Sequence, residues 1–331
     1  MTETSLRSEA LRVVYDPGYN LHFYGLERLH PFDSRKYGRA MAALRRRVPQ
    51  LVELRPGGPV EAADLRLVHS EEYLDSLTDR ATVARALELP FLAWLPTGLL
   101  DRRVLHPMRL ATRGTMVAAD EALSHGFAVN LGGGYHHAGP TNGEGFCVYA
   151  DIALAIRRLR RDGRLSPEGR VVYVDLDAHQ GNGVARCVLE DRSVRLFDVY
   201  NGLIYPCGDP VVEARIDHRV PLRPGAGTEA YLAILRERLP SFLDESATVG
   251  PIELAIFNAG TDIHERDPLG GLAVSADGIR ARDRLVVSEL RGRGIPTLFL
   301  PSGGYTPESW QLIADSLVEL AVRPGEVTLE A

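Results

Sequence analysis

Four short apolar runs in this sequence each end directly in residues that can bind a metal ion or move a proton. The runs cover residues 127–131, 171–176, 252–257 and 296–300, and their composition is typical of buried strands in a parallel sheet. In an open parallel sheet, ligands bind beyond the carboxyl ends of the strands. We therefore expect the following polar segments to meet at one site: residues 132–137, 175–183, 258–262 and 302–305.

The second and third of these segments contain a candidate metal site. Asp177 and His179 are two positions apart, so at a strand end their side chains can point the same way and share one ion. Asp262, from another strand end, would complete a set of one imidazole and two carboxylates. Such a set leaves a position open for water and substrate, as in catalytic rather than structural zinc sites. It does not select strongly between zinc and Fe(II).

The number of metal ions also follows from this segment. Hydrolases of the arginase type, which bind two metal ions, use the motif DxHxD, and its last carboxylate binds the second ion. Gly181 occupies that position here, so the sequence predicts a single catalytic ion.

Two adjacent histidines, His136 and His137, follow three glycines in the first segment. A neutral imidazole can take a proton from water that a metal ion has acidified. Each ring needs a partner on its other nitrogen to fix its tautomer, and Asp175 and Asn182 are the candidates. An aspartate partner favours the cationic ring, whereas an asparagine partner orients the ring without adding charge. Tyr305, after Ser-Gly-Gly, can donate a hydrogen bond to a carbonyl oxygen and stabilise an oxyanion.

These motifs together resemble those of the histone deacetylase family, which has the arginase/deacetylase fold. The matching stretches are GGGYHHA, GFCVYAD, DLDAHQGNG, NAGTD and SGGY. Four others resemble the class IV branch in particular: YNLHFYGLERLHPFD, HPMR, DVYNGLIYP and DPLGGLAVS. The resemblance covers roughly residues 11–320.

The resemblance implies a role for each residue of the site. His137 would be the general base, His136 an electrostatic or acid partner, and Tyr305 the donor to the substrate carbonyl. One zinc ion would be bound by Asp177, His179 and Asp262, and a structural potassium ion by Asp198 and by carbonyls around Asp175 and His179. Gly145 would offer its carbonyl to the substrate amide, and the tunnel walls would be formed by Phe146, Tyr205 and Leu269. Many deacetylases have aspartate where this chain has Asn182.

The expected substrate is an acylated lysine side chain in a peptide or protein. The class IV resemblance favours long-chain acyl groups. An acetylpolyamine or another small acylated amine is the alternative, but such enzymes usually carry acidic residues at the tunnel mouth, and residues 90–107 contain only Asp101. A catalytically silent acyl-lysine reader is disfavoured, because every expected metal ligand and catalytic residue is present.

The remaining pattern predicts a three-layer αβα fold with a mostly parallel central sheet, forming a single catalytic domain over residues 1–331. Helices are expected over residues 109–125, 149–161, 184–190, 229–244, 277–291 and 307–320, with a further strand at 194–199. Nearer the N-terminus we expect a strand at 13–15 and helices at 34–47 and 70–77. Residues 90–107 lack periodicity and are a candidate active-site loop.

Composition limits the partners. A net charge of −6 gives no electrostatic reason to expect nucleic-acid binding, and a mildly acidic body tolerates a cationic substrate. Three cysteines at unrelated spacings argue against a disulfide framework. The first 25 residues do not read as a signal peptide, and no apolar run is long enough for a membrane span. A cytoplasmic protein is expected, and its oligomeric state is left open.

Overall fold

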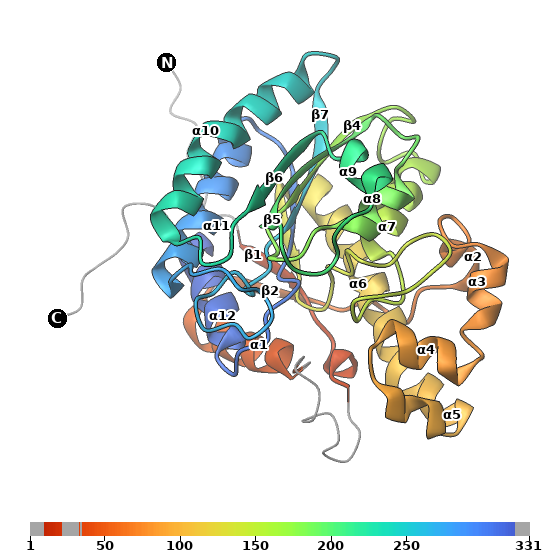
Figure 1. Cartoon of the computed structure of the whole chain (residues 1–331). Helices are drawn as coiled ribbons and strands as arrows, with labels where there is room; N and C mark the ends of the chain where they lie inside the picture. Colours follow the sequence, from red (N-terminus) through yellow and green to blue (C-terminus); the bar gives the residue numbers. More distant parts are fainter. Residues whose placement is uncertain (1–9, 22–32, 34, 322–331) are drawn as a thin grey trace.

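The computed structural model describes residues 10–21, 33 and 35–321, and within them eight parallel strands form one sheet (Figure 1). The strand order is β2-β1-β3-β8-β7-β4-β5-β6. The strands are β1 (Leu11–Val14), β2 (Leu51–Leu54), β3 (Phe127–Asn130), β4 (Arg170–Asp175), β5 (Val194–Asn201), β6 (His218–Leu222), β7 (Ile252–Asn258) and β8 (Thr297–Leu300).

Both faces of the sheet are buried, because successive residues of a strand point to opposite sides. In β4, Val172 and Val174 belong to one hydrophobic cluster, whereas Val171 and Tyr173 belong to the other. The same alternation occurs in β7 and β8. This double burial explains the nearly continuous apolar runs that identified these strands in the sequence.

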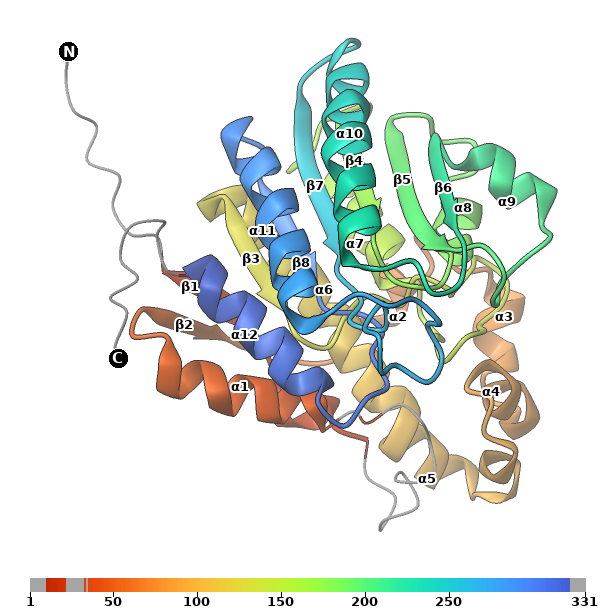
Figure 2. The same cartoon turned by 60° about the vertical axis from the view of Figure 1, so that its left-hand side comes forward.

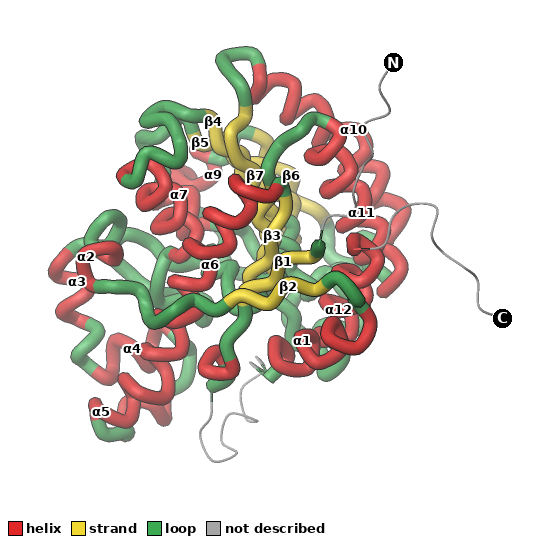
Figure 3. The backbone as a smooth tube through the Cα atoms, turned by 180° about the vertical axis from the view of Figure 1, so that it is seen from behind, coloured by secondary structure: helices red, strands yellow, loops and turns green. Residues whose placement is uncertain are grey.

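Helices cover each face, which confirms the predicted αβα layering. One layer consists of four helices that Figure 2 shows side by side across the sheet: α1 (Lys36–Arg47), α10 (Thr228–Ala247), α11 (Ala276–Gly292) and α12 (Ser309–Ala321). The opposite layer is built on α6 (His106–His125), α7 (Asp151–Arg161) and α8 (Asn182–Cys187). Figure 3 shows the strands enclosed between the two layers.

Several short elements extend the second layer and contribute side chains to its hydrophobic cluster. These are α2 (Ala62–Leu65), α3 (Glu71–Ser76), α4 (Arg80–Ala86), α5 (Thr97–Leu100) and α9 (Pro210–Arg215), with a 3-10 turn η3 (Pro90–Trp94) and a π-helical turn η4 (Asp101–Leu105). The 3-10 turn η1 (Pro17–Tyr19) contributes Tyr19 to the cluster on the other face of the sheet. The expectation that 90–107 is a loop is therefore wrong. Its prolines and short turns hide a helical path that runs directly into α6.

Strands β2 and β6 were not predicted from the sequence, and both lie at edges of the sheet. An edge strand tolerates polar residues and proline, and β6 contains Pro221. The predicted helices otherwise correspond to observed ones within a few residues. Most of the motif YNLHFYGLERLHPFD falls in 22–32, outside the described residues.

The four strands that precede the polar segments are neighbours, in the order β3-β8-β7-β4. All four run parallel, so their carboxyl ends adjoin at the centre of one edge of the sheet. The predicted convergence of the four segments is thus confirmed. No helix in the described part of the chain is long and apolar enough to cross a membrane. The single-domain organisation and the cytoplasmic location stay predictions.

Candidate active site

Asp177, His179 and Asp262 come together beyond the ends of β4 and β7. One potential ligand atom from each lies within 4.8 Å of the others, and all three residues are buried. The His179 Nδ1 atom is 2.9 Å from Asp262 Oδ2 and 3.1 Å from Asp177 Oδ1. One imidazole and two carboxylates this close fit a divalent metal ion, since the three donors already converge on one point.

The backbone fixes both carboxylates. Asp177 Oδ1 accepts from the amide of His179 at 3.0 Å, and Asp177 Oδ2 accepts from the amide of Gly303 at 2.9 Å. Asp262 Oδ1 accepts from the amide of Ala178 at 2.8 Å. A Cβ atom added at Gly303 would lie only 2.5 Å from Asp177 Oδ2. Glycine is required at this position because the chain passes directly against the candidate ligands.

The charges of the cluster favour a bound cation. Burial and the neighbouring Asp177 carboxylate raise the pKa of Asp262 to about 7. For Asp177, burial acts in the same direction, but His136 and the hydrogen bond from His179 outweigh it and hold the pKa well below its usual range. Two buried carboxylates that repel each other in this way are stabilised by a positive ion between them.

His136 has a carboxylate partner. Its Nδ1 atom lies 2.9 Å from Asp175 Oδ2, which also accepts from the hydroxyl of Tyr173 at 2.6 Å. Asp175 Oδ1 accepts from the side-chain amide of Asn258 at 2.9 Å. Burial favours the neutral imidazole, but Asp175 and Asp177 outweigh burial and raise the pKa of His136 to about 9. These two carboxylates thus favour the cationic form of His136.

His137 has an amide partner instead. Its Nδ1 atom lies 2.7 Å from Asn182 Oδ1, and its ring centroid is 4.0 Å from that of His136. Burial, together with the positive charges of His136 and His179, lowers the pKa of His137 well below 6.5. The two adjacent rings thus differ in charge, and His137 is the one that can accept a proton.

Tyr305 enters the site from the loop after β8. Its backbone amide donates to Asp267 Oδ2 at 2.8 Å, and its ring stands nearly perpendicular to that of His179, with centroids 6.1 Å apart. Burial and the nearby Asp177 raise the pKa of Tyr305 well above 10, so the phenol keeps its proton. Lys36 Nζ, on α1, donates to the carbonyl of Ser302 at 2.7 Å and supports this loop from behind.

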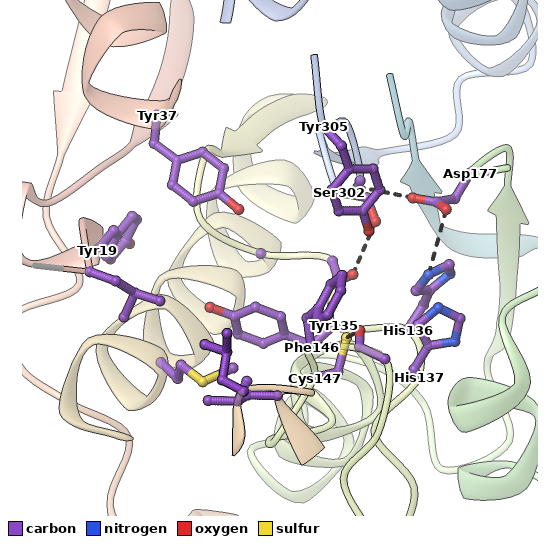
Figure 4. Close-up of a pocket in the computed structure, with 18 of the residues that line it drawn as sticks. Tyr19, Tyr37, Tyr135, His136, His137, Phe146, Cys147, Asp177, Ser302 and Tyr305 are labelled. Carbon is purple, nitrogen blue, oxygen red and sulfur yellow. Dashed lines mark hydrogen bonds and ion pairs between the residues drawn. The ribbon is translucent and has the colours of Figure 1, made fainter. Parts of the chain in front are cut away.

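These side chains border a cavity with an empty volume of about 920 Å³, open mouth included. Gly145 and Phe146 line it, and both have left-handed backbone conformations with φ of 54° and 66°. Figure 4 shows Tyr19 and Tyr37 across the cavity from the two histidines. The rest of the lining is mostly apolar and includes Leu21, Leu87, Leu89, Phe91 and Met108.

Two expected tunnel residues and the expected potassium ligand lie outside this set. Tyr205 is 43% exposed, and its ring centroid is 5.3 Å from that of His137. Leu269 is half-buried, and its amide donates to Asp267 at 3.0 Å. Neither is among the described residues that line the cavity. Asp198 is buried on β5, and its Oδ1 atom has no hydrogen-bond partner among the described residues.

Three residues that support the site belong to none of the motifs that predicted it: Lys36, Glu144 and Arg282. Lys36 is the only lysine of the chain and is 2% exposed, while Arg282 is fully buried. The scarcity of lysine was visible in the sequence. The importance of Glu144 and Arg282 arises from contacts with residues 38 and 106 positions away, which no local pattern encodes.

The comparisons with known proteins agree on one family. Residues 30–321 match the model of the histone deacetylase domain. Histone deacetylase 2 of Arabidopsis thaliana is 43% identical over 313 residues, which cover 93% of this chain and 78% of that protein. A probable deacetylase of Methanothermobacter thermautotrophicus is 28% identical over 316 residues, covering 90% of this chain and 86% of the relative.

Solved structures show the same fold. The HD domain of HDA15 superposes with a TM-score of 0.73 at 20% identity, covering 95% of this chain and 88% of that one. An HDAC homolog complexed with SAHA gives a TM-score of 0.71 at 23% identity, covering 95% and 84%.

Proposed function

Because this chain belongs to the histone deacetylase family, and is therefore a metal-dependent amidohydrolase, we propose that it hydrolyses the side-chain amide of acylated lysine in peptides or proteins. The observation that carries the proposal is the arrangement of three groups around one cavity. A candidate metal cluster, a pair of histidines with unlike partners and a half-buried phenol face the same space.

We propose that Asp177, His179 and Asp262 hold zinc, whose chemistry there would be that of a Lewis acid that polarises the acyl carbonyl and acidifies water. His137 would take the proton from the attacking water at Nε2, since its Nδ1 is engaged by Asn182. Tyr305 would donate to the carbonyl oxygen as negative charge develops on it.

His136 would supply positive charge beside the reacting atoms. Its partner Asp175 keeps it cationic, so it favours the negatively charged transition state. Departure of the lysine amine requires a proton, which His137 or His136 would return. Phe146 and Tyr205 would flank the entering lysine chain, and Gly145 would accept from the substrate amide.

The apolar lining supports a preference for long acyl chains, which the class IV resemblance also suggests. The cavity continues from the histidines toward Tyr19 and Tyr37, beyond the space that an acetyl group needs. Asp177 is the only acidic residue among the described lining residues. This gives little support to a polyamine substrate, whose additional ammonium groups need anionic partners.

The test compares one lysine peptide carrying acetyl, octanoyl or myristoyl with acetylated spermidine, using zinc-loaded protein. We expect hydrolysis of the peptides, fastest for a long acyl chain, and loss of activity in His137→Ala. A matched control is His125→Ala, since His125 is an exposed histidine at the end of α6. If only acetylated spermidine is hydrolysed, the substrate is a small acylated amine and not an acylated lysine. If no substrate is hydrolysed, the proposed function is contradicted.

We also propose that Asp198 contributes to a potassium site. Burial and the adjacent Asp175 raise the pKa of Asp198, and its Oδ1 atom, which has no hydrogen-bond partner in the described part of the chain, fits a cation ligand. Potassium added to salt-depleted protein should raise its melting temperature, and Asp198→Asn should remove most of that increase. An equal increase in both proteins would exclude this role.

A further inference from the structure

Asn182, the amide partner of His137, is itself held by a carboxylate. Its Oδ1 atom lies 2.7 Å from His137 Nδ1, and its Nδ2 atom donates to Glu144 Oε1, also at 2.7 Å. Asn182 is 1% exposed, so water cannot substitute freely for either partner. The three side chains form one chain of hydrogen bonds that leads from the surface to the proposed base.

Glu144 decides which atoms donate and which accept along this series of hydrogen bonds. An ionised carboxylate has acceptors only, so it must face the NH₂ group of Asn182. The amide oxygen then faces His137 and accepts, which places the ring proton on Nδ1 and leaves the lone pair on Nε2. The oxygen and nitrogen of an amide are nearly equal in size, so packing alone does not choose between its two orientations. In the flipped amide, the NH₂ group would donate to Nδ1, and the proton would move to Nε2.

Glu144 is held in place by its surroundings. Arg186 donates to Glu144 Oε1 and also to Asp209 Oδ2, the latter at 2.9 Å. The backbone carbonyl of Glu144 accepts from the amide of Cys147 at 2.9 Å, which closes the turn that carries Gly145 and Phe146. Because Arg186 neutralises Glu144 and a neutral amide separates Glu144 from the ring, the carboxylate orients His137 without acting as its direct counter-ion.

We propose that Glu144 is a positioning residue that fixes the orientation of the Asn182 amide and, through it, the tautomer of His137. The consequence for catalysis rests on the proposed function, in which Nε2 of His137 receives the proton. The tautomer itself does not depend on any substrate. The competing explanation is that Glu144 only anchors Arg186 at the surface.

The first test reads the tautomer directly. Zinc-loaded protein labelled with ¹⁵N-histidine is compared by long-range ¹H–¹⁵N correlation, and the His137 signals are assigned from their loss in His137→Gln. We expect the Nδ1–H form in the wild type and a substantial share of the Nε2–H form in Glu144→Met. Glu213→Met is the matched control, because Glu213 is similarly exposed and ion-paired with Arg219. An unchanged His137 tautomer in Glu144→Met would overturn the proposal.

The second test is a rescue and includes a variant that keeps the size of Glu144. In Asn182→Asp, two carboxylates face each other, and we expect kcat to fall about tenfold or more, with KM changing less. Adding Glu144→Gln supplies an NH₂ group that donates to the new aspartate, so kcat should rise again several-fold. In the wild-type background, the same Glu144→Gln change should not raise kcat.

The effect of Glu144→Gln on kcat is thus expected to differ between the Asn182→Asp and wild-type backgrounds, and this difference distinguishes the two explanations. If Glu144 only anchors Arg186, Glu144→Gln will have the same effect in both backgrounds, and the proposal fails. If the wild type hydrolyses none of the acylated substrates, the proposed function fails, and the NMR measurement still decides the role of Glu144. Should Glu144→Met not fold, the NMR comparison is made with Glu144→Gln in the wild-type background, because a glutamine can both accept from and donate to the Asn182 amide and so no longer selects one orientation.

Discussion

Arg282 connects the two strand ends that carry the candidate metal ligands. Its guanidinium is fully buried and donates to the carbonyls of Leu176 at 3.1 Å and Gly260 at 2.7 Å. Leu176 directly precedes Asp177, and Gly260 lies two residues before Asp262. A buried cation that spans both segments should hold the two carboxylates at a fixed separation, even before a metal ion is bound.

The change Arg282→Met keeps most of the aliphatic stem and removes the charge. Asp283, whose Oδ1 atom accepts from Arg282 at 2.7 Å, would keep, among the described side chains, only the hydroxyl of Ser316, 2.6 Å from its other oxygen. Removing one partner of a buried ion pair costs about 3–5 kcal/mol. The carbonyls that lose Arg282 as a donor add to this cost but are not independent of it. We therefore expect the free energy of unfolding to fall by about 4 kcal/mol, a large share of the usual stability of a domain.

The assay is urea denaturation of chelator-treated protein, followed by zinc titration of the folded variant. We expect a lower denaturation midpoint and zinc affinity reduced about 10–100-fold, as for other residues that orient metal ligands. Arg284→Met is the control on the same helix, because Arg284 is 59% exposed and its ion pair with Glu319 is worth about 0–1 kcal/mol. The double change Arg282→Met/Asp283→Leu removes both charges and should restore much of the stability without the zinc affinity. If Arg282→Met and Arg284→Met have the same denaturation midpoint and the same zinc affinity, Arg282 does not hold the two carboxylates at a fixed separation.

Three further outcomes are expected. Tyr305→Phe should lower kcat of the zinc-loaded enzyme about 10²–10³-fold, and near-full activity would remove the phenol from the proposed mechanism. Gly303→Ala should displace the candidate ligand carboxylates and weaken zinc binding in a titration, whereas Gly98→Ala, with no atom within 4 Å of the added Cβ, should not. Burial lowers the pKa of His69 to about 4, and its Nε2 accepts from the amide of Ala150. An unfolded chain binds this proton near pH 6.5, so stability should fall by about 3 kcal/mol between pH 6.5 and 4, and His69→Gln should lack this loss in urea titrations.

How far the sequence predicted the structure depends on how local each signal is. The four central strands are buried on both faces, so their residues are apolar without interruption and the runs stand out. The edge strands β2 and β6 have no such constraint, and Pro221 in β6 argues against a strand by itself. The helical path through 90–107 was hidden because turns of four or five residues are too short to show a period.

The contacts of the site also divide into those that a local sequence pattern predicts and those that it does not. The grouping of Asp177, His179 and Asp262 followed from strand ends, because parallel strands bring their carboxyl ends together whatever lies between them in the chain. Glu144 and Arg282 could not be found by that rule. Each acts through one side chain or a few carbonyls reached across the fold, and an isolated glutamate or arginine is most often a solvated surface residue.

The different partners of His136 and His137 have a physical reason in their proximity. Two imidazolium ions with centroids 4.0 Å apart repel each other, so a pair with two carboxylate partners would compete for one positive charge. Asp175 assigns that charge to His136, whose pKa rises to about 9. Asn182 offers His137 an acceptor without a charge, so burial and the neighbouring cation keep this ring neutral. The asparagine at position 182, where many deacetylases have aspartate, therefore favours the division of roles between a cationic and a basic histidine. It also explains why the orientation of one amide group, and the carboxylate that fixes it, should matter for the rate.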